Sequence, residues 1–261
     1  VSKLPNGSSS DKFVADTLKA NALPVITLPT IGWVPFDRTK RCAYSVAKYG
    51  QQNGTDGGDC GSGRLLNGSR IVNDPKDTSR AVGPDYAVAW LDHLAGRFGK
   101  DVVERSVLIL DNEPNFWSGT HRDVHPHDLT YDELWGYTVA YATAVRARYP
   151  GAIIAGPDTT TFQWLWKPVN ASSGAPLPLI EALITDVAAH HKAHGVKLLD
   201  VIDIHCYPEA SFNESRVDAA SDVAMRMRLT RELWDPAFFA ESWQLTPTYY
   251  LRRVRSLIEQ H

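Results

Sequence analysis

The sequence predicts an α/β fold in which parallel strands alternate with helices. Short apolar runs alternate along the chain with longer segments whose apolar residues recur at helical spacing. The apolar runs are nearly continuous, which is typical of parallel strands that are covered on both faces. No shift in composition divides the 261 residues, so we expect one domain over residues 1–261.

The pattern places each element in turn. The expected strands are 23–28, 106–110, 152–156, 199–204 and 237–240. The expected helices are 11–21, 84–99, 131–149, 177–195, 215–234 and 247–260. Thr130 lies three residues before Glu133, which is the spacing of a capping box, and Pro84 suits the first turn of a helix. Residues 32–82 show no regular pattern and are expected to form a long loop.

Two architectures fit this alternation, a barrel and an open doubly wound sheet. A closed (β/α)8 barrel needs eight strands, so the expected strands would leave it incomplete at one or both ends. No G-x-G-x-x-G follows a strand, so a nucleotide-binding open sheet would lack its phosphate cradle. No G-x-S-x-G is present, which excludes the nucleophile elbow of α/β-hydrolases.

Composition and charge exclude several classes of protein. Hydrophobic residues make up 43% and charged residues 22% of the chain, so it is not a disordered chain. The net charge of −3 lacks the basic excess of a nucleic-acid-binding protein. No run approaches 18 apolar residues, so we expect no membrane span. Eight Trp, ten Tyr and eight Phe residues indicate either sugar-binding platforms or an aromatic core.

The cysteines favour a protein of an oxidising compartment. Cys42 and Cys60 flank a stretch rich in Gly, Asn and Asp that cannot fold through burial, so we expect a disulfide there, with two free thiols as the alternative. Cys206 lies in an apolar strand pattern and is expected to be a buried free thiol. With the cysteine pair, the N-x-S/T triplets favour a secreted protein. These triplets begin at Asn6, Asn53, Asn67, Asn170 and Asn213.

The strongest chemical signal is Asp111-Asn112-Glu113-Pro114, directly after the expected strand 106–110. In a barrel, the carboxyl ends of the strands carry the active site. A glutamic acid there can protonate a glycosidic oxygen, and a neighbouring asparagine amide can bind the sugar 2-hydroxyl in the transition state. The alternative is a loop turn with a solvated acid.

Aromatic and histidine residues follow this motif. Phe116 and Trp117 place aromatic surface beside the acid. His121 and His125 are four residues apart, but Pro126 and the lack of a helical pattern disfavour a metal pair. We expect these histidines to contact sugar hydroxyls or to hold the loop.

At this point the residues resemble glycoside hydrolase family 44, whose members are endo-acting β-1,4-glucanases and xyloglucanases. The resemblance lies in L-D-N-E-P-N-F-W at 110–117, T-H-x-D-V-H-P at 120–126 and T-Y-D-E-L at 130–134. Further blocks agree in order at 24–33, 151–157, 199–208, 233–236 and 241–243, so that the resemblance covers about 24–260. It implies a (β/α)8 TIM barrel that is incomplete at both ends in this chain, and retention of anomeric configuration.

The resemblance also implies roles for individual residues. Glu113 matches the general acid/base, and Asn112 matches its amide neighbour. Further substrate-binding residues are expected to line the cleft. They are Trp33, Trp117, His121, His205, Tyr207 and Trp243.

A retaining mechanism needs a second carboxylate about 5–5.5 Å from the first, as nucleophile. The resemblance places that glutamate beyond His261. From the pattern alone the candidate is Glu241, which follows the apolar run 237–240. Asp111, Asp158 and Asp203 are weaker candidates, because acids in strands are more often hydrogen-bonded structural groups.

Together these observations predict a retaining endo-acting hydrolase of β-1,4-glucan of the cellulose or xyloglucan type. The alternatives are a non-catalytic glycan-binding barrel, or a xylanase or mannanase of the same superfamily. We expect a polysaccharide as the partner, with no nucleic acid or membrane, and a secreted monomer. No organic cofactor is expected, and the resemblance allows a structural calcium ion whose ligands the sequence does not identify.

Overall fold

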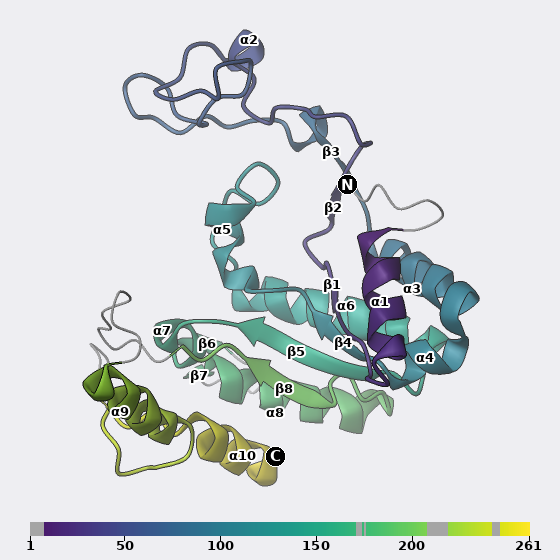
Figure 1. Cartoon of the computed structure of the whole chain (residues 1–261), viewed down its shortest axis with the longest axis vertical. Helices are drawn as coiled ribbons and strands as arrows, with labels where there is room; N and C mark the ends of the chain where they lie inside the picture. The colour runs from purple at the N-terminus through teal and green to yellow at the C-terminus, as the bar shows by residue number, and fades with distance from the viewer. Residues whose placement is uncertain (1–7, 171–173, 175, 208–218, 242–245) are drawn as a thin grey trace. The chain divides into compact units, whose positions relative to one another are not determined.

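The computed structural model describes residues 8–170, 174, 176–207, 219–241 and 246–261 (Figure 1). The chain packs into two compact units, Val1–Ala155 and Gly156–His261. The boundary falls inside a strand, so the two units share one continuous piece of backbone.

A parallel sheet forms the framework of the first unit. β1 (Val25–Leu28) pairs in parallel with β4 (Val107–Leu110), and β4 pairs in parallel with the first residues of β5 (Ile153–Thr159). The register sets Leu28 opposite Leu110 and Ile109 opposite Ala155. Parallel strands need crossover connections, and the intervening helices supply them.

The first unit also contains helices outside the long loop. They are α1 (Ser9–Lys19), α3 (Pro84–Phe98), α4 (Lys100–Arg105), the 3-10 turn η2 (Pro114–Phe116), α5 (Trp117–Thr120) and α6 (Tyr131–Arg148). α3 packs against α4 and α6. The fully buried core side chains include Leu28, Leu91, Leu108, Val145 and Ile154. The expected capping box is present, because Thr130 accepts a hydrogen bond from the backbone of Glu133 and Glu133 accepts one from the backbone of Thr130.

The expected long loop at 32–82 contains short regular elements. β2 (Trp33–Pro35) pairs antiparallel with β3 (Ser79–Ala81), and α2 (Val46–Tyr49) and η1 (Pro75–Asp77) lie between them. The expected disulfide between Cys42 and Cys60 is present.

Side chains from beyond α5 hold this loop. The guanidinium of Arg122 stacks on the ring of Tyr44 at 4.6 Å and donates hydrogen bonds to the carbonyls of Ser62 and Gly63. The Asn73 amide donates to the carbonyl of Asp123 at 3.0 Å. A segment with little apolar burial of its own is therefore fixed by a covalent link and by polar contacts.

The second unit begins with the end of β5, which lies next to β8 (Val201–Ile204). The His205 amide donates to the carbonyl of Thr159 at 2.9 Å, so the pairing continues past the end of β8. Its other elements are α7 (Phe162–Leu165), β6 (Pro168–Asn170), β7 (Pro176–Pro178), α8 (Leu179–His194), α9 (Ala220–Leu229), η4 (Thr230–Leu233) and α10 (Tyr250–Gln260). α8 and α10 pack on each other, with Ile180, Leu183 and Val254 buried.

The predicted α/β class is confirmed, and the parallel strands are those of a (β/α)8 barrel-type fold. The described residues hold four parallel strands, fewer than the eight of a closed barrel. The expected strand at 237–240 is wrong, because the described backbone there forms a single bridge between Phe239 and Pro247. The expected helix 215–234 is observed as α9 and η4, and residues 215–218 lie outside the described ranges.

Three further expectations can be compared with the structure. Cys206 is a free thiol that is partly buried, and burial raises its pKa to about 11. Asn53, Asn67 and Asn170 are exposed, whereas Asn6 and Asn213 lie outside the described residues. None of the described helices is long and apolar enough to cross a bilayer.

Candidate active site

The motif singled out in the sequence forms a strained turn at the carboxyl end of β4. Asp111 has φ of 67° and Glu113 has φ of 48°, both in the left-handed region that non-glycine residues rarely adopt. Each such residue costs about 1 kcal/mol or more and persists only when its surroundings hold it. Asn112 is exposed and Glu113 is half-buried, so both side chains remain within reach of a ligand.

The buried carboxylate of Asp111 holds this turn. Its Oδ2 accepts hydrogen bonds from the Thr30 amide at 2.6 Å and from the Thr30 hydroxyl at 3.1 Å. Its Oδ1 accepts from the Trp117 indole N–H at 3.2 Å and from the backbone N–H of Asn112 at 2.9 Å. One carboxylate therefore ties the ends of β1 and β4 to the start of α5.

These contacts indicate that Asp111 positions the turn. They argue against Asp111 as the nucleophile, a role for which the sequence made it a weaker candidate. A nucleophile needs an oxygen lone pair directed at the substrate, and both oxygens of Asp111 already accept two donors each. The position at the end of an apolar strand, directly before Asn-Glu, is the sequence signal that could have identified this role.

The backbone after Glu113 continues as a tight turn. Pro114 begins η2, and the Phe116 amide donates to the Glu113 carbonyl at 2.9 Å. Proline disfavours right-handed helical backbone in the residue before it, and Glu113 has φ of 48° and ψ of 52° instead. The turn thus carries Glu113 at a strand end without continuing into a long helix.

Trp117 differs from the expected sugar platform. The ring is 2% exposed and packs edge-on against His125 at 5.1 Å and Tyr137 at 5.6 Å. Its indole N–H donates a hydrogen bond to the carboxylate of Asp111. Trp117 therefore stabilises the turn and has no open ring face for a ligand in this unit. His121 is exposed, and its Nδ1 lies 2.9 Å from the Thr120 hydroxyl.

Trp33 lies on β2 and borders an aromatic cavity of about 430 Å³ in the first unit. Tyr86, Trp90 and Tyr141 also line this cavity. Its walls are largely apolar, with polar groups from Ser10 and Thr27. Apolar walls with a few polar groups are the usual lining of a small-molecule site.

In the second unit, His205 and Tyr207 follow β8 as the sequence suggested. The His205 Nε2 lies 2.9 Å from Oδ1 of Asp158 on β5. The Tyr207 ring is 65% exposed and stands edge-on to the imidazole, with the centroids 6.1 Å apart. Burial, with Asp203 nearby, raises the pKa of Asp158 to about 6, and His205 opposes this shift.

Glu241 does not follow a strand, because the apolar run 237–240 does not form one. Its two carboxylate oxygens accept hydrogen bonds from Nε and Nη2 of Arg228 at 2.8 and 2.9 Å. This guanidinium lowers the pKa of Glu241 and holds it ionised on an exposed part of the surface. Trp243 lies outside the described residues.

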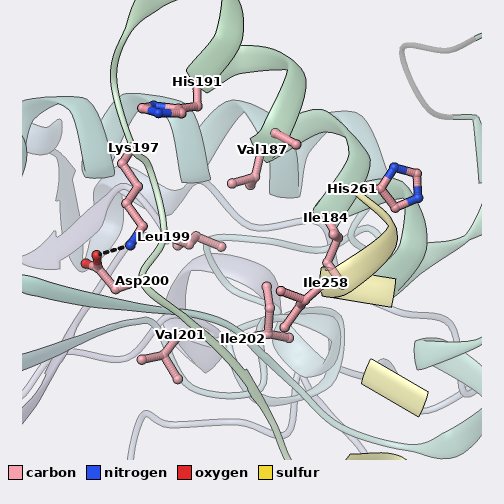
Figure 2. Close-up of a pocket in the computed structure, with 11 residues that line it drawn as sticks. Ile184, Val187, His191, Lys197, Leu199, Asp200, Val201, Ile202, Ile258 and His261 are labelled. Atoms are coloured by element: carbon pink, nitrogen blue, oxygen red, sulfur yellow. Dashed lines mark ion pairs between the residues drawn. The ribbon is translucent and has the colours of Figure 1, made fainter. Parts of the chain in front are cut away.

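A larger cavity, of about 520 Å³, lies between α8, α10 and the amino end of β8 (Figure 2). Apolar side chains such as Ile184, Leu199 and Ile258 face into it. Within its lining, Lys197 and Asp200 form an ion pair at 3.0 Å. It is therefore an apolar space away from the strand ends that carry the candidate residues.

No three or more His, Cys, Asp or Glu side chains of the described residues come together where they could hold a metal ion. The calcium ion that the resemblance allows therefore has no carboxylate cluster among those side chains.

The sequence matches a family model described as Glycoside hydrolase family 44 over residues 2–210. Over 247 residues the chain is 28% identical to the "Beta-mannanase/endoglucanase A" of Caldicellulosiruptor saccharolyticus, covering 87% of this chain and 17% of that protein. It is 31% identical over 173 residues to "Endoglucanase A" of Paenibacillus lautus, covering 62% and 25%.

Solved structures show the same likeness. CelM2, described as a bifunctional glucanase-xylanase from a metagenome library, superposes with a TM-score of 0.83 at 30% identity, covering 97% of this chain and 53% of that one. A Paenibacillus polymyxa xyloglucanase of family 44 has a TM-score of 0.67 at 22% identity, covering 96% and 51%, which shows the fold alone. The chain thus spans about half of these solved relatives and a quarter or less of the curated ones.

Proposed function

Because the chain belongs to glycoside hydrolase family 44, we propose that it is an endo-acting hydrolase of β-1,4-glucan of the cellulose or xyloglucan type, with Glu113 as the general acid/base. The observation that carries this proposal is the turn locked by Asp111, which holds Asn112 and Glu113 at the carboxyl end of a parallel strand. In barrel enzymes this end of the strands carries the catalytic residues.

In the proposed reaction Glu113 first donates its proton to the glycosidic oxygen while a second carboxylate attacks the anomeric carbon. Glu113 then takes a proton from the water that hydrolyses the glycosyl-enzyme, so that configuration is retained. The side-chain amide of Asn112 donates a hydrogen bond to the sugar 2-hydroxyl, and this contact strengthens as the oxocarbenium-like transition state forms.

The second carboxylate has two candidate sources. One is Glu241, which Arg228 keeps ionised, as a nucleophile requires. The other is the half of the solved relatives' length that this chain does not cover. Glu241 is exposed and does not follow a strand, whereas barrel enzymes carry their catalytic residues at strand ends, which favours the second source.

A xylan-degrading activity is the second candidate function. CelM2, at 30% identity, is described as a glucanase-xylanase, so xylan belongs in the substrate panel beside cellulose derivatives, xyloglucan and mannan. We further propose that both units belong to one catalytic domain, since the family match runs through both. The disulfide supports a secreted protein, and light scattering would test the proposed monomer.

The test is Glu113→Gln, assayed by release of reducing ends from each polysaccharide. We expect kcat to fall by about 10²- to 10⁴-fold, the usual contribution of a general acid. An aryl glycoside whose leaving group needs no proton should lose much less. Glu259→Gln on the exposed surface of α10 is the matched control. Equal losses on both substrates would contradict the acid role, and full activity would contradict the assignment altogether.

A further inference from the structure

The end of β5 carries a buried carboxylate that the proposed reaction does not use. Asp158 is 4% exposed, and its Oδ1 lies 2.9 Å from Nε2 of His205, whose side chain is 23% exposed. The backbone reinforces this pair, because the His205 amide donates to the carbonyl of Thr159. Two neighbouring strands therefore bring a carboxylate and an imidazole together both through their main chains and through their side chains.

The backbone of Asp158 is strained. Its φ of 52° lies in the left-handed region, directly after Gly156 and Pro157. Backbone strain of this kind clusters at functional sites and is retained only when surrounding contacts fix it. The strain falls on the residue whose side chain meets the imidazole.

The charge of Asp158 determines what the contact does to His205. Burial and the neighbouring Asp203 carboxyl raise the pKa of Asp158 to about 6, with His205 opposing the shift, so at pH 8 Asp158 is mostly ionised. The hydrogen in the 2.9 Å contact then belongs to Nε2. A neutral imidazole with its hydrogen on Nε2 has a lone pair on Nδ1, so the carboxylate selects one of the two tautomers.

We propose that Asp158 is a positioning residue for His205, which it holds in one orientation and in the Nε2–H tautomer just after the carboxyl end of β8. The inference rests on the proposed function, since it assigns Asp158 a part in glucan hydrolysis through His205. A carboxylate that accepts from a functional histidine fixes the ring and its tautomer in the same way in other enzymes. The opposing view is that the pair only stabilises the fold.

A double-mutant cycle separates these two roles. We expect Asp158→Asn to lower kcat on the preferred glucan by about tenfold or more with little change in KM, because an amide donates to Nε2 and imposes the other tautomer. With His205→Ala already present, Asp158→Asn should cause no further loss. A purely structural pair would be coupled in the free energy of unfolding but would leave kcat of the folded single variants close to the wild-type value, and that outcome would overturn the proposal.

A second buried aspartate in contact with a histidine offers a matched control. Asp11 is 4% exposed and lies 2.7 Å from His93 Nε2, between α1 and α3. Asp11→Asn makes the same chemical change away from the strand ends, and kcat should stay within twofold of the wild type. Asp158→Glu keeps a carboxylate and should retain more kcat than Asp158→Asn; the reverse order would count against the positioning role.

A measurement that needs no activity completes the test. The ¹⁵N shifts of the imidazole nitrogens at pH 8 report the tautomer of His205 in the folded protein. We expect the Nε2–H form in the wild type and the Nδ1–H form in Asp158→Asn. If no glucan is hydrolysed, the proposed function fails, and these shifts still decide whether the pair exists. A wild-type Nδ1–H form, or the same tautomer in both proteins, would overturn the inference.

Discussion

Replacing Asp158 by asparagine is expected to stabilise the fold at neutral pH and to change little near pH 4. Burial raises the pKa of this carboxyl to about 6, whereas its ordinary value is 3.8. The folded protein therefore resists ionising a group that ionises readily in the unfolded chain. Asparagine has nearly the same shape and never becomes charged, so it avoids this penalty.

The size of the effect follows from the two pKa values. The pKa of about 6 lies about two pH units above 3.8, and at about 1.36 kcal/mol per pH unit this corresponds to about 3 kcal/mol. Between these pH values the folded state keeps a proton that the unfolded state has released. The wild-type free energy of unfolding therefore falls as pH rises from about 4 through 6, as far as this group is concerned.

Urea unfolding of the wild type and Asp158→Asn at pH 4.0 and pH 7.5 measures this effect. The variant should gain up to about 3 kcal/mol over the wild type at pH 7.5 and almost nothing at pH 4.0. Asp132→Asn, at an exposed position in the first turn of α6, controls for the substitution itself and should change the free energy by less than about 0.5 kcal/mol. A difference between wild type and Asp158→Asn that does not widen with pH would refute the reasoning.

Three other predictions concern the first unit. Asp111→Ala should lower the free energy of unfolding by about 3 kcal/mol, because it leaves buried donors without an acceptor; a loss below about 1 kcal/mol in urea would contradict its holding role. Leu108→Ala should lower it by about 3–5 kcal/mol, because Leu108 is fully buried, and an unchanged urea midpoint would argue against the observed core. Replacing Cys42 and Cys60 by serine removes a disulfide between residues 18 positions apart. A link of this length lowers the entropy of the unfolded chain and contributes about 3 kcal/mol to the free energy of unfolding. Limited proteolysis should then cut between residues 36 and 74 much faster, and an unchanged cleavage rate would show that contacts such as those of Arg122 are sufficient.

The sequence was most informative where local and tertiary requirements agree. Apart from Ser106, the runs at 106–110 and 152–156 are apolar, and the structure pairs them in parallel within the same sheet. The spacing of Thr130 and Glu133 sets the start of α6, because both partners of a capping box lie within one turn. Such signals depend on neighbours in the sequence, so a pattern can reveal them.

The apolar run 237–240 shows where a pattern is insufficient. The Asp235 carboxylate accepts from the Ala237 amide at 2.9 Å, and its carbonyl accepts from Phe238. These bonds make a turn and remove donors that a strand would need. Four apolar residues are compatible with a strand or with a buried turn, and only the tertiary contacts distinguish them.

Trp117 shows the same limit at the candidate site. The sequence places an aromatic ring near the acid but contains no information on which way the ring faces. The deciding contact is with Asp111, whose other oxygen accepts from Thr30, 81 residues away in the sequence. A hydrogen-bond network that joins two strand ends depends on chain topology. For this reason Trp117, expected to bind substrate, instead packs inside the protein and donates to Asp111.

Strained backbone occurs at the carboxyl ends of two strands, β4 and β5. Among the described residues six non-glycine positions have positive φ, and three of them are Asp111, Glu113 and Asp158 at the ends of β4 and β5. Chains violate local preferences chiefly where function demands it. If Asp158→Asn gains stability at neutral pH while losing kcat, the raised pKa and the strain serve the reaction. If it gains stability and keeps kcat, the buried carboxylate of Asp158 does not serve the reaction. The link between backbone strain and function would then depend on Asp111 and Glu113 at the end of β4.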